Sequence, residues 1–205
     1  MKTQNNLTDR TRLDYWPFII GPLVMVIVYI LYGFNEISAS DKGMLENIHL
    51  ILIATALLLF TAVAVKQKNI FSYVMTALCF SFFCRELHFV GTSTGVYVAI
   101  AIIAALAISK RKQIISIIEQ GKIKPWLYAT GFTYLLSQLI ARRIFRHILP
   151  NEHDVHVILE EMVEFAAHAM MIITAIITFR TKKSSEHMPH VPQNNPQPEA
   201  NLNKK

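Results

Sequence analysis

The sequence is short of charge, of cysteine and of the common catalytic motifs. Only 17% of its 205 residues are charged and 53% are hydrophobic, whereas about 25% of a soluble domain is charged. This balance excludes a disordered protein, a coiled coil and a typical nucleic-acid-binding domain. The two cysteines, Cys79 and Cys84, would point about 140° apart on a helix, which disfavours a disulfide. A serine-nucleophile motif, a Gly-rich phosphate loop and a His-Glu-x-x-His motif are all missing.

Long apolar runs predict an all-α fold, a polytopic membrane helix bundle with six transmembrane helices. A helix needs about 20 residues to cross roughly 30 Å of hydrocarbon. The first run lacks a small-residue cleavage site after it, so we expect it to remain as a helix. We expect residues 1–180 to form the transmembrane domain and residues 181–205, rich in Lys, Pro, Asn and Gln, to form a disordered cytoplasmic tail. The six runs cover about residues 16–34, 47–65, 70–90, 95–109, 125–141 and 155–179.

Basic residues are divided unevenly between the predicted loops. Of the 20 Lys and Arg residues, 15 fall on the side that holds both termini; the other five are Lys42, Arg85, Arg142, Arg143 and Arg146. The positive-inside rule therefore predicts that both termini are cytoplasmic, in a bacterial inner membrane. The expected partner is the lipid bilayer with its anionic headgroups, and nucleic acid is not expected.

The last predicted span carries a polar stripe. At 100° per residue, His153, His156, Glu160, Glu164 and His168 fall within about a third of the helix circumference, and Glu161 lies beside His168. A charged side chain near the middle of a bilayer costs at least ~2.5 kcal/mol. These groups are therefore expected to face the bundle interior or a wet cavity.

Other spans bring ionisable groups to the same side. Glu46 and His49 have the i, i+3 spacing of carboxylate-bridged metal sites in helical bundles. The third span ends with Arg85, Glu86 and His88, and Arg85 can pair with a glutamate of the last span. The fifth span supplies Gln138, Arg142 and Arg143.

Carboxylates and imidazoles that converge from three helices suit Zn, Fe or Mn. A metal ion with an open position would activate water for hydrolysis near the outer leaflet, with Glu164 and Glu160 as the candidate catalytic carboxylates. The predicted metal ligands are Glu46, His49, Glu86, His88, Glu161, Glu164 and His168.

Non-enzymatic functions stay open at this point. The same groups could form a structural salt-bridge network, a proton or cation pathway or a bis-histidine haem site. Arg85, Arg142 and Arg143 are candidates for holding a small ligand or an anionic lipid headgroup, as in a sensor or partner protein. The sequence does not choose between these classes.

Two segments carry a resemblance. Residues Cys84-Arg85-Glu86-Leu87-His88-Phe89 and Glu160-Glu161-Met162-Val163-Glu164-Phe165 resemble the Arg-Glu and Glu-Glu-x-x-Glu segments of small uncharacterised bacterial inner-membrane proteins. The resemblance covers about 15 residues and a six-span layout. It implies a membrane location and no activity.

Overall fold

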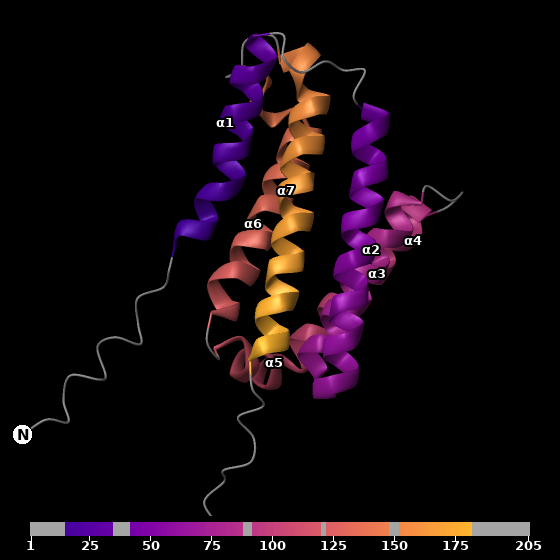
Figure 1. Ribbon diagram of the computed structural model, residues 1–205. Coiled ribbons are helices and arrows are strands. Elements are labelled where there is room, and N and C mark those ends of the chain that lie inside the picture. Colours follow the sequence, from indigo (N-terminus) through magenta and orange to yellow (C-terminus); the bar gives the residue numbers. More distant parts are fainter. Residues whose placement is uncertain (1–14, 35–41, 88–91, 120–121, 148–151, 182–205) are drawn as a thin grey trace, which may run out of the picture.

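The computed structural model describes residues 15–34, 42–87, 92–119, 122–147 and 152–181, and all regular structure in these ranges is helical (Figure 1). The predicted tail lies outside the described residues except for Thr181, and the predicted metal ligand His88 also lies outside them. The elements are η1 (Trp16–Ile19), α1 (Ile20–Gly33), α2 (Lys42–Gln67), α3 (Ile70–Glu86), α4 (Thr92–Ser109), α5 (Arg111–Ile118), α6 (Ile123–Ala141), η3 (Ile144–His147) and α7 (Glu152–Arg180).

Helix α7 is the centre of the bundle. It packs against α1, α2 and α6, while α3 packs on α2 and α4 packs on α3. Helices α1, α3 and α6 run up the page in Figure 1, and α2, α4 and α7 run down it. The apolar window within Val155–Arg180 is 56% buried, against 17% for Trp16–Gly33. Polar groups on α7 are therefore enclosed by neighbouring helices.

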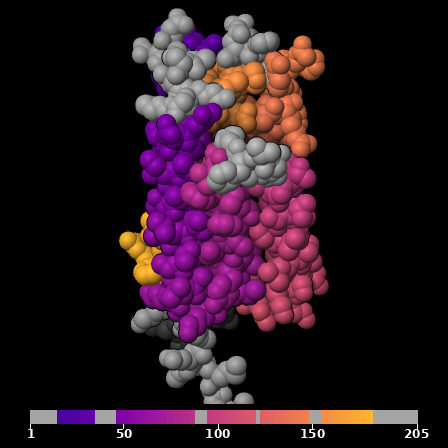
Figure 2. All heavy atoms as spheres, turned by 90° about the vertical axis from the view of Figure 1, so that its right-hand side faces the viewer, coloured from indigo at the N-terminus to yellow at the C-terminus, as the bar shows by residue number. Residues whose placement is uncertain are grey.

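The outer surface is apolar, as a lipid-facing surface must be. Large side chains such as Leu58, Phe80 and Ile102 are exposed, and Figure 2 shows the face on which α2, α3 and α4 lie. Within the described residues, three helices are long and apolar enough to cross a membrane, over Trp16–Gly33, Glu46–Gln67 and Val155–Arg180. A fourth span is possible if Thr94–Ser109 and Arg111–Ile118, bent by 84°, act together. The chain is thus a helical membrane protein whose described residues contain three or four candidate spans, and the six-span count stays a prediction.

Helix α5 lies where the sequence predicts a loop between two spans. Ile114 and Ile118 lie one turn apart and are buried in the core, while Arg111 and Lys112 are exposed. This segregation makes α5 amphipathic. Such a helix can lie in a membrane interface with its apolar face inward.

The turn between α2 and α3 fixes three helices at the end of the bundle near α5. Lys68 adopts a left-handed backbone with φ 49°, and the Asn69 side chain caps α3 by accepting from the Ser72 N–H at 2.8 Å. The Gln67 amide donates to the Thr178 carbonyl of α7 at 2.7 Å. Helix α3 therefore begins beside α2, and α2 is tied in turn to α7.

Helices α1 and α6 approach closely at Gly21. A Cβ built there would lie 2.9 Å from Thr133 Oγ1. Thr133 is fully buried, and its hydroxyl donates to the Ala129 carbonyl at 2.9 Å. Small residues permit this kind of contact between membrane helices.

We expect Gly21→Ala to lower the free energy of unfolding by about 1–3 kcal/mol, because Thr133 has no room to move away. Thermal unfolding in detergent measures the effect. Gly131→Ala on α6 is the matched control, since its Cβ meets nothing within 4 Å. It should leave the melting temperature unchanged or higher, because Ala is the better helix former. Equal losses in the two variants would contradict close packing at Gly21.

Candidate metal centre

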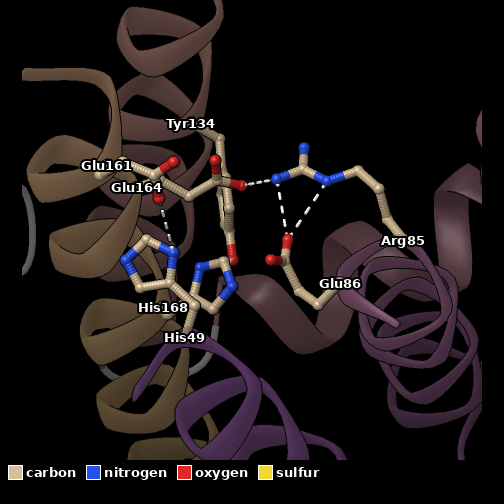
Figure 3. A network of polar contacts seen from close by, with 7 residues as sticks. All are labelled: His49, Arg85, Glu86, Tyr134, Glu161, Glu164 and His168. Atoms are coloured by element: carbon tan, nitrogen blue, oxygen red, sulfur yellow. Dashed lines mark hydrogen bonds and ion pairs between the residues drawn. The ribbon is translucent and has the colours of Figure 1, made fainter. Parts of the chain in front are cut away.

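Four helices contribute to one buried polar cluster (Figure 3). It lies near the end of the bundle where α2 and α7 begin and α3 ends. We call this set the polar cluster; its members are His49 of α2, Arg85 and Glu86 of α3, Tyr134 of α6, and Glu161, Glu164 and His168 of α7.

Arg85 holds two buried carboxylates. Its Nη2 lies 2.9 Å from Glu86 Oε1 and also contacts Glu164 Oε1, and its Nε donates to Glu86 at 3.2 Å. The Glu86 and Glu164 side chains are only 8% and 6% exposed. The expected pairing of Arg85 with a glutamate of the last span is confirmed. One guanidinium charge is shared by two carboxylates, so these three groups together carry one excess negative charge when both are ionised.

Two imidazoles are buried beside these carboxylates. His49 is 1% exposed and His168 is fully buried, with ring centroids 5.4 Å apart. His49 Nδ1 lies 3.3 Å from Glu161 Oε2, and His168 Nδ1 lies 3.0 Å from the Tyr134 hydroxyl. The Nε2 atom of each ring is buried without a hydrogen-bond partner. Burying an unsatisfied polar atom costs about 1–3 kcal/mol, so the Nε2 atom of each ring lowers the stability of the folded protein.

The partner of His49 decides its tautomer. A carboxylate only accepts hydrogen bonds, so Nδ1 of His49 carries the proton toward Glu161. In the neutral ring, Nε2 then presents a lone pair. Metal-binding histidines have this arrangement, in which one nitrogen is held by a carboxylate and the other faces the metal.

Three ligand atoms already lie together. Carboxylate oxygens of Glu86 and Glu164 and a ring nitrogen of His168 are all within 4.8 Å of one another. Ligand atoms of a tetrahedral zinc ion lie about 3.4 Å apart, because each bond is about 2.1 Å long and the bonds meet at about 109°. Small side-chain movements would therefore bring the three groups onto one ion.

The other residues predicted for the site are spread more widely. Glu46 is exposed one turn before His49, and Glu160 is half-buried one turn before Glu164. Arg142 is exposed and Arg143 half-buried; they lie about 12 Å along α6 from Tyr134 by helical rise. The role of both arginines in ligand binding stays a prediction.

Sequence reasoning missed Tyr134. Tyr134 lies four positions before Gln138, a polar residue in an otherwise apolar span. Residues four apart share a helix face, so Gln138 was a signal that this face of α6 is polar. An apolar-rich span gives no further reason to single out its tyrosine.

A row of buried hydroxyls continues from the polar cluster along α6 and α7. Thr130, Thr133, Thr174 and Thr178 each donate to the carbonyl four residues earlier, at 2.7–2.9 Å. These hydroxyls satisfy their donors within their own helices. The row therefore suits close helix packing better than a proton relay.

The fold and the site together define a helical membrane protein with an ionisable cluster enclosed by four helices. Comparison with models of protein families, with curated proteins and with solved structures finds no match to the chain.

Arg85→Met should lower the free energy of unfolding by about 3 kcal/mol, because it leaves two neighbouring carboxylates buried without their guanidinium. Adding Glu164→Gln should recover part of the loss, since one of the two charges is then removed. Thermal unfolding in detergent measures both variants, and Arg142→Met is the control at an exposed arginine. Additive losses in the double variant would show that the ion pair is not the cause.

Proposed function

We propose that the polar cluster binds a divalent metal ion, Zn, Fe or Mn, and uses it for hydrolysis. The main support is the surroundings of the two imidazoles. Nδ1 of His49 contacts Glu161 and Nδ1 of His168 contacts Tyr134, while both Nε2 atoms are buried without a hydrogen-bond partner. Purely structural histidines would be expected to satisfy both nitrogens. A metal ion would satisfy the free nitrogens.

The proposed ligands are His168, Glu86 and Glu164, with His49 as the fourth. Mixed imidazole and carboxylate donors suit these metals. A divalent ion would also offset the negative charge that Arg85 leaves uncompensated on its two carboxylates. When bound, such an ion makes a coordinated water acidic enough to supply hydroxide near neutral pH.

Each remaining residue has a separate role in this proposal. Glu161 and Tyr134 orient the two imidazoles. Arg85 holds Glu86 and Glu164 in place. Glu160 lies one turn from Glu164 on the same face of α7 and is half-buried, so we assign it to accept the proton of the attacking water. Glu164, which Arg85 engages, serves as a ligand and not as this base.

We further propose a six-span bacterial inner-membrane topology. Helices α3 and α6 have 17 and 19 residues, about 26 and 29 Å, and they run alongside α2 and α7 in Figure 1. The opposite end of the bundle from the polar cluster carries basic residues: Lys66, Lys110, Arg111, Lys112 and Lys124. The positive-inside rule turns that end to the cytoplasm, so the cluster lies toward the outer leaflet.

The first test is the metal content of the purified chain. Full-length protein carried on a tag without histidine, expressed in medium supplied with Zn, Fe and Mn, should contain about one ion per chain by elemental analysis. His168→Ala and Glu164→Gln should lose it. His147→Ala changes an exposed histidine and should retain it.

A second readout covers variants that fold poorly. Adding zinc to chelated wild-type protein should raise its stability by about 2.7 kcal/mol at a hundredfold excess over Kd, and His168→Ala should show no such gain. A well-folded wild type that holds no metal and gains no stability from any of the three ions would refute the proposal in favour of a structural salt-bridge network.

Tyr134→Phe tests the orientation of His168. Loss of the hydroxyl should weaken metal affinity about 10–100-fold, the usual effect of removing a group that orients a ligand. Competition with a chelator of known affinity measures this, and Tyr128→Phe at an exposed tyrosine is the control. A stability loss without any change in metal affinity would mean that Tyr134 only packs against the imidazole.

A further inference from the structure

A groove enters the bundle between α3, α4 and α6. Its volume is about 390 Å³, within the range of roughly 300–1,000 Å³ for small-molecule sites. An α-helix is about 10 Å across, so a partner helix does not fit. Its lining residues are Phe82, Arg85, Val96, Tyr97, Ile100, Tyr134, Leu135 and Gln138.

The groove opens on the lipid-facing surface. Tyr97 and Leu135 line it and are 66% and 57% exposed. Both belong to the apolar outer surface of the bundle. A molecule would therefore reach the groove sideways from the bilayer.

Polarity changes along the groove. Helices α3 and α6 rise toward the polar cluster end (Figure 1), so Arg85 lies about one turn above Phe82, and Gln138 lies about one turn above Tyr134. Helix α4 descends, and its lining residues are Val96, Tyr97 and Ile100. One end of the groove is polar and the other apolar, which is the distribution of a lipid with its head toward the outer leaflet.

The groove and the polar cluster share two residues. Arg85 binds Glu86 and Glu164, yet its own side chain is 32% exposed. Tyr134 contacts His168 through its hydroxyl and also lines the groove. A head group at the polar end would therefore contact Arg85 and Tyr134, the residues that bind the two carboxylates and His168.

We propose that the groove holds one acyl chain of a bilayer phospholipid, with its ester carbonyl at Arg85 and Gln138. An ester carbonyl is uncharged and accepts hydrogen bonds from both side chains. A phosphate is a poorer fit there, because Arg85 already faces two carboxylates. Acyl esters are then the substrate class of the metal centre, a step that rests on the function proposed above.

Hydrolysis adds one water molecule across the ester. The water oxygen bonds to the carbonyl carbon, the ester C–O bond breaks, and the leaving alkoxide takes the proton that Glu160 received. The products are a free fatty acid and a lysolipid. The fatty acid carries a carboxyl group and the lysolipid a hydroxyl group where the ester was, and both leave sideways into the bilayer by the same opening.

The test is photolabelling in phosphatidylcholine vesicles that contain a phospholipid with a diazirine at the end of its acyl chain. The full-length, metal-loaded protein is irradiated and the adducts are mapped by mass spectrometry. Labelling should concentrate on Ile100 and Leu135. Ile100→Trp, which fills the groove, should reduce it about tenfold, whereas Ile102→Trp on the same helix, at an exposed position outside the groove, should not.

Two further measurements separate this inference from the metal proposal. His168→Ala should lose metal and fatty-acid release but keep the groove labelling; Ile100→Trp should keep metal and lose fatty-acid release. Labelling spread evenly over the outer surface would overturn the groove assignment. Concentrated labelling with bound metal but no fatty-acid release from the wild type would overturn the substrate class alone.

Discussion

The pairing of Arg85 with Glu86 and Glu164 is the interaction on which the rest of the site depends. An ionised carboxylate enclosed by apolar helices is costly unless a cation lies beside it, and Arg85 supplies that cation from the end of α3. Since α3 and α7 are joined mainly through α2, this contact also fixes the end of α3 relative to α7. Loss of the guanidinium would leave the two carboxylates without a compensating positive charge, and Glu86 would no longer be held in position.

The histidines turn this ion-pair network into a candidate metal centre. An Arg–Glu network alone can be structural, and it would need no imidazole with an unsatisfied nitrogen. In both His49 and His168, Nδ1 contacts a partner side chain and Nε2 is buried without a hydrogen bond. That arrangement costs stability, which is typical of groups retained for binding.

The groove connects the polar cluster to the bilayer. Arg85 and Tyr134 belong to both, so an occupant of the groove would contact the residues that hold the carboxylates and orient His168. The apolar part of the groove opens beside Tyr97 and Leu135 on the apolar outer surface, so the proposed acyl chain would enter it directly from the bilayer. Access from the bilayer requires no water-filled entrance on the outer side.

The sequence by itself determined the helical class, the membrane location, the polar face of α7 and the pairing potential of Arg85. These follow from local rules, since hydropathy and helical periodicity need only neighbouring residues. Helix α5 was missed because its apolar face is short and lies among basic residues. Only the tertiary structure decided that Tyr134 joins the cluster, that Glu46 is exposed, and that a groove reaches Arg85. Those facts depend on how α6 packs against α7, how α3 packs on α2 and how α4 packs on α3. Contacts between segments far apart in the sequence leave no periodic pattern in it.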